Sequence, residues 1–181
     1  MAITLITGPA RSGKSEWAEQ LADQSAQASQ KQIVYIATAK TDPDDAEWQA
    51  RIENHRQRRP PHWHCQEVPT DLDAAIEQFS SPSSCLLIDS LGTWLANLIE
   101  QDDTTWTNTQ QALITALSQA PGDIILVAEE TGWGVVPAYE LGRTFRDRLG
   151  HLSRSVGAIA TDVYLVTSGY ALNISTLGRR I

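Results

Sequence analysis

The segment GPARSGKS, residues 8 to 15, matches the phosphate-binding pattern G-x-x-x-x-G-K-[ST]. It follows a short apolar run and opens a stretch of helix-forming residues, which is the order that this motif requires. In such a loop, backbone N–H groups surround the phosphates, Lys14 reaches the β- and γ-phosphates, and Ser15 can bind Mg²⁺. A chance glycine-rich turn is the alternative, which these flanks disfavour. The predicted nucleotide-binding residues here are Gly8, Pro9, Ala10, Arg11, Ser12, Gly13, Lys14 and Ser15.

A nucleotide site of this kind also needs a carboxylate at the end of a neighbouring strand, to hold the magnesium shell. The run CLLID ends in an acid, Asp89, and has the required form. The alternative is that Asp89 or Ser90 caps a helix starting at Leu91. The metal-binding and the helix-capping roles are compatible, and the metal role is favoured because a phosphate loop requires such a ligand nearby. We therefore predict that Ser15 and Asp89 bind Mg²⁺.

The block RIENHRQRRPPHWH, residues 51 to 64, surrounds His55 with arginines, and Glu53 is the acid within it. Arginine presents a planar fork of donors that suits phosphate oxygens, and a neutral histidine is a nucleophile near neutral pH. The cluster is therefore suited to phosphate chemistry. Its arginines are Arg51, Arg56, Arg58 and Arg59.

His55 also has a structural interpretation. In a helix, Trp48, Ile52 and His55 share one stripe, so the imidazole could pack at the edge of an apolar face. From the residues alone, a structural and a functional His55 remain equally open.

Three further segments resemble site motifs. AKTD, residues 39 to 42, has Ala39 where the guanine motif of GTPases needs Asn or Thr, and it lies too early in the chain. HWHC, residues 62 to 65, lacks a second ligand pair for zinc and alternates like a strand. Residues 130 to 137, with Trp133, follow an apolar strand, so we expect a substrate or nucleotide loop there.

Apolar runs and helical stretches alternate along the chain. Continuous apolar runs are typical of parallel strands that are covered on both faces. The pattern predicts an α/β fold, with a mostly parallel sheet and helices on both faces, in one domain over residues 1–181. The expected strands are 3–8, 32–38, 84–90, 123–129 and 162–169. The expected helices are 14–28, 43–58, 91–101, 107–120 and 137–160.

The bulk composition narrows the function classes. The chain has 181 residues and a net charge of -8, which argues against general nucleic-acid binding. Its two cysteines, Cys65 and Cys85, are too few for a disulfide scaffold and suit a reducing cytoplasm. The N-terminal segment lacks signal-peptide features, and the longest apolar stretch is too short to span a bilayer. We expect a cytoplasmic protein with no membrane span.

Over nearly its whole length, the sequence resembles the bifunctional adenosylcobinamide kinase/adenosylcobinamide-phosphate guanylyltransferase family of cobalamin biosynthesis. The phosphate loop alone is common to many enzymes, whereas the arginine-histidine block and the later segments are much more specific together. The segments that carry the resemblance are TGPARSGKS, YIATA (35–39), RIENHRQRRPPHW, QE (66–67), LLIDSLGTWLANLI, EETGWGVVP and GRTFRDRLG.

The resemblance implies a RecA-like P-loop fold, a homotrimer and two activities. The first activity phosphorylates adenosylcobinamide with ATP or GTP, and the second transfers GMP from GTP to adenosylcobinamide phosphate. His55 would form a guanylyl intermediate and Lys14 would assist phosphoryl transfer. The residues expected to join the phosphate loop at the nucleotide are Ala37, Thr38, Ala39, Arg56, Gln57, Arg58, Arg59, Glu67 and Asp89.

The sequence departs from the family pattern at three places. Asn54 stands where some relatives carry a second histidine, and Glu129 replaces a usual asparagine. Residues 150–157 read GHLSRSVG, whereas the family commonly continues G-R-x-N-Q after the FRDRLG segment. If the Asn-Gln pair of the family contacts the corrinoid or a neighbouring subunit, substrate affinity or assembly would differ in this chain. Two other functions stay open: a P-loop kinase for another small molecule with a structural His55, and a non-catalytic nucleotide switch or assembly motor.

Overall fold

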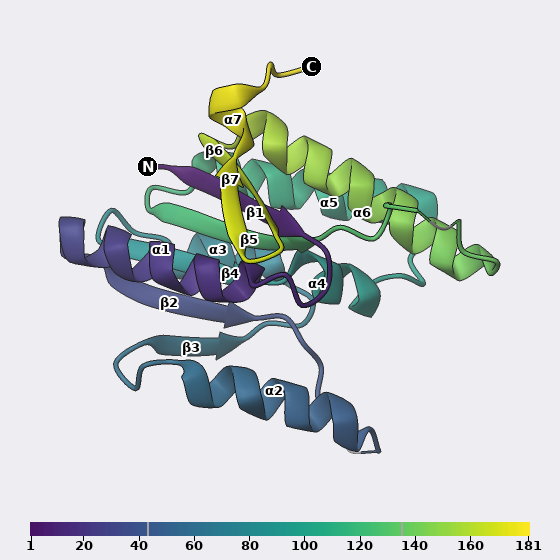
Figure 1. The fold of residues 1–181 in the computed structure, drawn as a ribbon, viewed down its shortest axis with the longest axis horizontal. Helices are drawn as coiled ribbons and strands as arrows, with labels where there is room; N and C mark the ends of the chain where they lie inside the picture. The colour runs from purple at the N-terminus through teal and green to yellow at the C-terminus, as the bar shows by residue number, and fades with distance from the viewer. Residues whose placement is uncertain (43, 135) are drawn as a thin grey trace.

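The strands of the chain form one seven-stranded sheet within the part that the structure describes (Figure 1). The computed structural model describes residues 1–42, 44–134 and 136–181, and of residues 51 and 54 the backbone alone. The strand order is β3-β2-β4-β5-β1-β6-β7, and only β6 and β7 pair antiparallel. The strands are β1 (Ile3–Gly8), β2 (Gln32–Ala37), β3 (His64–Glu67), β4 (Ser84–Asp89), β5 (Asp123–Glu129), β6 (Asp162–Thr167) and β7 (Tyr170–Asn173).

Helices cover both faces of this sheet, which confirms the predicted α/β class (Figure 1). One face packs against α1, and the other packs against α3, α4, α5 and α6. A further helix, α2, lies beyond the edge strand β3. The helices are α1 (Lys14–Ser29), α2 (Ala46–Arg58), α3 (Leu72–Phe79), α4 (Leu91–Asn97), α5 (Asp103–Gln119), α6 (Glu140–Ile159) and α7 (Ile174–Leu177).

The continuous apolar runs are explained by the two covered faces. Along β2, Ile33 and Tyr35 point into the cluster that contains α1, whereas Val34 and Ile36 point into the opposite cluster. Side chains of a strand alternate between the faces of a sheet, so a strand with both faces covered must be apolar at every position.

Several element boundaries differ from the predicted ones because of local capping. Helix α2 begins at Ala46, since Asp45 accepts a hydrogen bond from the backbone of Trp48; the predicted start at residue 43 lies outside the described residues. Helix α5 begins earlier than predicted, at Asp103, because Asp102 caps it. The residues of α3, β7 and α7 form elements that the sequence patterns did not predict.

The two helices nearest the C-terminal ends of β4 and β5 are shorter than predicted. Helix α4 ends at Asn97, and Arg148 binds the carbonyl oxygens of Ile99 and Gln101 beyond it, so that this segment leaves the helix. Helix α6 begins at Glu140 rather than at residue 137. None of the described helices is both long and apolar enough to cross a bilayer.

The strand that ends at Asp89 is not adjacent to the strand before the phosphate loop. Strand β5 lies between β1 and β4, so the expectation of directly neighbouring strands was wrong. The two strands nevertheless run parallel, and their C-terminal ends lie at the same edge of the sheet. The loops that follow parallel strands build ligand sites at this edge.

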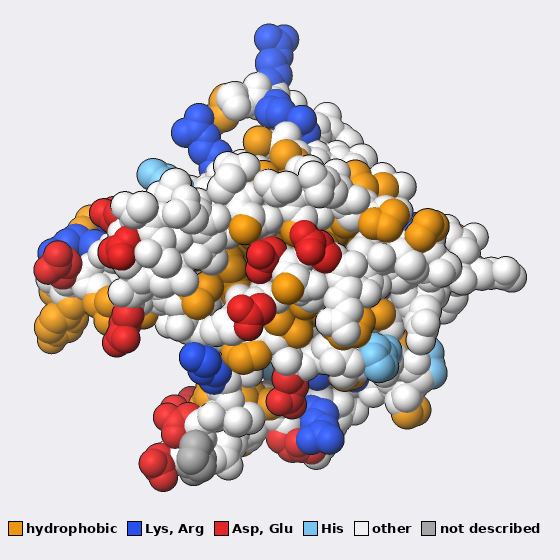
Figure 2. Space-filling view, turned by 180° about the vertical axis from the view of Figure 1, so that it is seen from behind, with side chains coloured by type: hydrophobic (Ala, Val, Ile, Leu, Met, Phe, Trp, Pro, Cys, Tyr) orange, Lys and Arg blue, Asp and Glu red, His pale blue; other side chains and the backbone are white. Residues whose placement is uncertain are grey.

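Charged side chains are mixed over the face seen in Figure 2. Lysine and arginine side chains lie in separate groups there, with acidic and apolar side chains between them. A nucleic-acid-binding domain typically gathers its basic residues into a patch or stripe instead. This face thus lacks the single basic patch that is typical of nucleic-acid binding (Figure 2).

Candidate active site

A cavity of about 980 Å³ opens at the C-terminal edge of the sheet, between the phosphate loop, the strand ends and α2. Its volume suits a nucleotide-sized ligand. Residues from the start of α1, from the ends of β2 to β5 and from one side of α2 line it. The predicted site residues among them are Lys14, Ser15, Ala37, Ala39, His55, Arg56, Arg59, Glu67 and Asp89.

The phosphate loop runs from the end of β1 into α1. Gly13 adopts a left-handed φ of 92°, which an L side chain would strain. A Cβ atom at Gly8 would lie 2.2 Å from the carbonyl oxygen of Val166, so only glycine fits there. Both glycines are therefore required by the backbone path. The loop residues Pro9, Ala10, Arg11 and Ser12 complete it without lining the cavity.

Two polar side chains of the loop are buried. Lys14 donates a hydrogen bond to the carbonyl oxygen of Pro9 at 3.3 Å, which holds its ammonium group within the loop. The hydroxyl of Ser12 is buried with no hydrogen-bond partner among the described residues. A buried hydroxyl without a partner is costly, and a bound phosphate would supply one.

Helix α2 places His55 at the cavity. The predicted stripe is present, since Trp48, Ile52 and His55 all line the cavity. The imidazole is 26 % exposed, so it is accessible to a ligand rather than packed away. Side chains of α2 therefore form one wall of the cavity, and His55 is its nucleophile candidate.

The arginines around His55 point in different directions. Arg56 and Arg59 line the cavity, and the guanidinium of Arg59 lies 3.7 Å from the ring centre of Tyr35. Arg58 turns away from it, toward α1. The Arg51 side chain, part of the predicted cluster, lies outside the described residues, as does that of Asn54.

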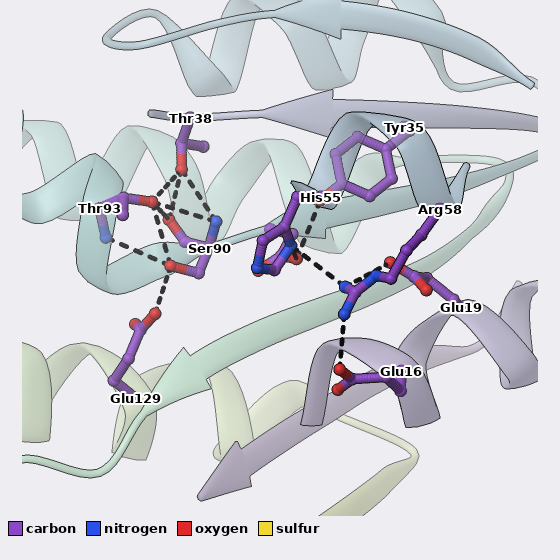
Figure 3. A network of polar contacts seen from close by, with 10 residues as sticks. Glu16, Glu19, Tyr35, Thr38, His55, Arg58, Ser90, Thr93 and Glu129 are labelled. Carbon is purple, nitrogen blue, oxygen red and sulfur yellow. Dashed lines mark hydrogen bonds and ion pairs between the residues drawn. The ribbon is translucent and has the colours of Figure 1, made fainter. Parts of the chain in front are cut away.

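Arg58 forms ion pairs with Glu16 and Glu19 of α1 (Figure 3). Burial alone would lower the pKa of Arg58, but the charges of the two glutamates raise it. The predicted contact residue Gln57 is exposed and donates to Glu53. Neither Gln57 nor Arg58 lines the cavity.

Asp89 ends β4 and faces the cavity. Its Oδ2 accepts a hydrogen bond from the hydroxyl of Tyr35 at 2.9 Å and lies 3.9 Å from Nδ1 of His55. Burial and the charge of Asp89 raise the pKa of Tyr35 well above its ordinary value, so this hydroxyl stays a donor. Ser90, not Asp89, caps α4, because its hydroxyl accepts from the backbone of Thr93. The Asp89 carboxylate thus remains available to a ligand.

Thr38, a predicted nucleotide contact, does not line the cavity but is buried behind its surface. Its hydroxyl donates to the carbonyl oxygen of Ser90 at 2.7 Å and accepts from the Ser90 backbone N–H at 2.9 Å. The side chain is fully buried. Thr38 therefore holds the ends of β2 and β4 together.

Glu129 lines the cavity, although the sequence patterns did not predict a role for it. It ends β5 and accepts a hydrogen bond from the Ser90 hydroxyl at 2.6 Å (Figure 3). It also accepts a hydrogen bond from the Gly92 N–H at 2.9 Å. Burial raises its pKa, and its hydrogen bond from Ser90 and the charge of Lys14 act in the opposite direction. The signal was present, since DIILVAE ends in an acid as CLLID does.

Residues 130–137, predicted as a substrate or nucleotide loop, do not line this cavity, whereas Cys65 of HWHC and Thr41 of AKTD do. Trp133 is 60 % exposed, in a loop whose residue 135 lies outside the described residues. Glu130, at the base of that loop, accepts a hydrogen bond from the Thr7 hydroxyl at 2.5 Å. The predicted strand at HWHC is partly present as β3, and the described residues contain no cluster of three or more metal-ligand side chains.

Comparison with known proteins agrees with this geometry. A family model described as "Cobinamide kinase / cobinamide phosphate guanyltransferase" matches residues 4–174. The bifunctional adenosylcobalamin biosynthesis protein CobP of Pseudomonas aeruginosa is 42% identical over 91% of this chain and 92% of its own length. The bifunctional adenosylcobalamin biosynthesis proteins CobU of Escherichia coli and Salmonella typhimurium are 38% and 35% identical, each over 94% of this chain and 98% of its own length. The chain belongs to the cobinamide kinase / cobinamide phosphate guanyltransferase family.

Proposed function

We propose that the chain catalyses two consecutive transfers at one nucleotide site. It phosphorylates the hydroxyl of adenosylcobinamide with ATP or GTP, and it then transfers GMP from GTP to the resulting phosphate. The observation that carries the proposal is that Lys14 of the phosphate loop and His55 of α2 line the same cavity. One group suits phosphoryl transfer and the other suits covalent nucleotidyl transfer.

The guanylyl transfer proceeds through His55. A nitrogen lone pair of its neutral imidazole attacks the α-phosphorus of GTP, so that an N–P bond forms and the bond to the bridging oxygen breaks. Pyrophosphate leaves with that electron pair, and the ring becomes positively charged. A phosphate oxygen of adenosylcobinamide phosphate then attacks the same phosphorus, the N–P bond breaks, and the electron pair returns to the imidazole.

The surroundings of His55 support this chemistry. The carboxylate of Asp89, 3.9 Å from Nδ1, offsets the positive charge that develops on the ring. Arg56 and Arg59, which line the cavity, supply donors for the phosphate oxygens. Charge that develops on the leaving pyrophosphate would thus meet preorganised cations.

The phosphoryl transfer uses the phosphate loop. The hydroxyl oxygen of adenosylcobinamide attacks the γ-phosphorus, its proton is released, and the nucleoside diphosphate leaves with the electron pair of the bridging oxygen. Lys14 lies at the N-terminus of α1, where its charge and the backbone N–H groups stabilise the negative charge on the transferred group.

The residues at the cavity fit Mg²⁺. Ser15 and Asp89 both line it and offer one hydroxyl and one carboxylate oxygen. Mg²⁺ is usually held by one or two protein ligands together with waters and substrate phosphates, rather than by an all-protein cage. When bound, the ion would neutralise negative charge on the phosphates, and Ser15 and Asp89 would hold it.

We further propose that the chain assembles as a homotrimer. Apolar side chains of β7 and α7 support an interface, since Tyr170 is 80 % exposed and Leu177 is 72 % exposed. Leu172, between them in the sequence, is 48 % exposed, and exposed apolar side chains along one segment are typical of a protein interface. Sedimentation at micromolar concentration tests the assembly, and a monomer would contradict it.

Incubation with GTP labelled at the α-phosphate, followed by denaturation, tests the proposed function. Wild-type protein should retain an acid-labile, base-stable label, as a phosphoramidate does, and His55→Ala should retain none. Nucleotide binding by both proteins is the control. A wild type that binds GTP without becoming labelled would instead favour a P-loop kinase for another small molecule.

A further inference from the structure

Glu129 is an ionisable cavity residue to which neither transfer step has yet given a role. It ends β5 at the position that pairs with Gly8, the first residue of the phosphate loop. The backbone N–H of the next residue, Glu130, donates to the carbonyl oxygen of Gly8 at 2.9 Å. The Glu129 side chain therefore starts from the strand directly beside β1, and it lines the cavity together with Lys14.

We propose that the Glu129 carboxylate is the general base of phosphoryl transfer and takes the proton of the adenosylcobinamide hydroxyl. The hydroxyl oxygen forms a bond to the γ-phosphorus while its proton moves to Glu129. The bond between the γ-phosphorus and the bridging oxygen breaks, and the nucleoside diphosphate leaves with that electron pair. Glu129 then releases the proton to solvent, which restores the carboxylate.

The inference rests on the proposed kinase activity and concerns this chain in particular. The family pattern usually has asparagine at this position, and the amide of asparagine does not accept a proton near neutral pH. Glutamate therefore supplies a chemistry that the usual residue lacks.

Two donors hold the carboxylate in place. Oε1 accepts a hydrogen bond from the Ser90 hydroxyl at 2.6 Å (Figure 3). Oε2 accepts one from the Gly92 N–H at 2.9 Å. The Ser90 oxygen accepts from the Thr93 N–H at 3.3 Å, so the hydroxyl proton of Ser90 is directed at Glu129. A carboxylate has about four acceptor positions, so these two bonds orient the group and leave it able to bind a substrate hydroxyl.

The surroundings of Glu129 suit a proton acceptor. Burial raises the pKa of Glu129, while the hydrogen bond from Ser90 and the charge of Lys14 act in the opposite direction. A carboxylate with a raised pKa is a stronger base than an exposed one. A carboxylate that is held in a partly buried position, in a cavity, is typical of a functional site.

The two transfers differ in their need for a base. The acceptor in phosphoryl transfer is a neutral hydroxyl, which must lose its proton. The acceptor in guanylyl transfer is a phosphate monoester, which is already ionised at neutral pH because its second pKa is about 6. The other nucleophile, His55, attacks as a neutral imidazole. Glu129 should therefore serve phosphoryl transfer alone, although both steps use one cavity.

Phosphorylation of adenosylcobinamide by ATP tests this role with Glu129→Gln, which keeps the size of the side chain and removes the base. The maximal rate should fall about 100-fold or more, as is typical when a general base is lost. The ATP concentration that gives half the maximal rate should stay within about twofold, since no ground-state contact with the nucleotide is removed. Glu129→Asn, which introduces the usual residue of the family, should show the same loss.

Guanylyl transfer by the same variants shows whether the loss is selective. Labelling by α-labelled GTP should stay within about twofold of wild type, and so should the transfer of GMP to supplied adenosylcobinamide phosphate. Equal falls in phosphorylation and labelling would make Glu129 a structural residue or a magnesium ligand and would overturn the inference. A raised half-saturating ATP concentration with an unchanged maximal rate would make it a nucleotide ligand and would also overturn it.

The matched control is Glu100→Gln, which removes a carboxylate from an exposed position and should phosphorylate like wild type. A wild type that does not phosphorylate adenosylcobinamide would overturn the proposed kinase activity itself. An active wild type with an equally active Glu129→Gln variant would overturn the role of Glu129 alone.

Discussion

Oδ2 of Asp89 lies 3.9 Å from Nδ1 of His55, so the end of β4 and the face of α2 meet at one ionisable pair. The same carboxylate oxygen accepts a hydrogen bond from the hydroxyl of Tyr35. Under the proposed function, Asp89 would bind the magnesium ion and would also face the imidazole of His55 from the end of β4. A residue shared by two steps should affect both when it is changed.

Asp89→Asn is expected to lower both the phosphorylation of adenosylcobinamide and the labelling of the protein by GTP. Each rate should fall about 100-fold, as is typical when one preorganised electrostatic group is removed. His55→Ala should abolish labelling but leave phosphorylation in place. Tyr35→Phe, which removes only the hydrogen bond to Asp89, is the control and should cost far less. Loss of a single activity in Asp89→Asn would contradict the shared role.

ATP and GTP should compete for the chain, because Lys14, Ser15 and His55 line one cavity. A non-hydrolysable ATP analogue should raise the GTP concentration needed for half-maximal labelling of His55 and leave the maximal rate unchanged. Initial labelling rates at several analogue concentrations measure this. A lowered maximal rate at saturating GTP would point to two separate nucleotide sites.

The sequence predicted the class of the fold and the residues whose placement follows from topology. Phosphate loops and acids at the ends of parallel strands must meet at one edge of the sheet, so Ser15 and Asp89 could be paired in advance. The family and the transferase class predicted from the motifs are confirmed by the comparisons. The short elements α3 and β7 were missed because four to eight residues give little periodicity.

The direction of each side chain could not be predicted. Arg56 and Arg58 belong to one run of basic residues, yet one lines the cavity and the other pairs with α1. That difference depends on which side chains of α2 come within reach of the acids of α1 in the folded chain, and the local sequence carries no signal for such a tertiary contact. Glu129 was noted only as a departure from the family, although it ends a buried strand at the cavity.

Gly92 makes room for Glu129, and Gly92→Ala should therefore destabilise the fold. A Cβ atom at this position would lie 2.0 Å from Oε2 of Glu129. Overpacking of this kind costs about 1–3 kcal/mol, or a fall of roughly 2–10 °C in Tm. Thermal unfolding followed by circular dichroism measures it.

Gly150→Ala is the matched control for Gly92→Ala. Gly150 lies inside α6, and its added Cβ would have no neighbour within 4 Å among the described residues. This variant should gain up to about 1 kcal/mol from better helix propensity. Truncating the neighbour in Gly92→Ala/Glu129→Ala should recover part of the lost Tm. No recovery would mean that the carboxylate is not the group with which the new methyl collides.

Glu129→Gln should raise stability at neutral pH, because burial raises the pKa of the Glu129 carboxyl above its ordinary value of 4.5. Between that value and the raised pKa, the folded chain holds a proton that the unfolded chain has lost. Stability that depends on this proton is present at low pH and is lost as the pH rises through the raised pKa. Glutamine is neutral at every pH, so the variant never buries a charge at this position and does not lose stability as the pH rises.

The comparison of Tm at pH 5 and pH 8 tests this directly. Glu129→Gln should melt above wild type at pH 8. The difference in Tm should shrink toward pH 5, because the Glu129 carboxyl of the wild type is then partly protonated and buries less charge. Glu100→Gln removes a carboxylate from an exposed position and should show no such dependence. The charge of Lys14 opposes the shift, so Glu129→Gln would melt below wild type at pH 8 if that attraction outweighed burial. A lower Tm at pH 8 would therefore make Glu129 and Lys14 a stabilising pair and contradict the raised pKa.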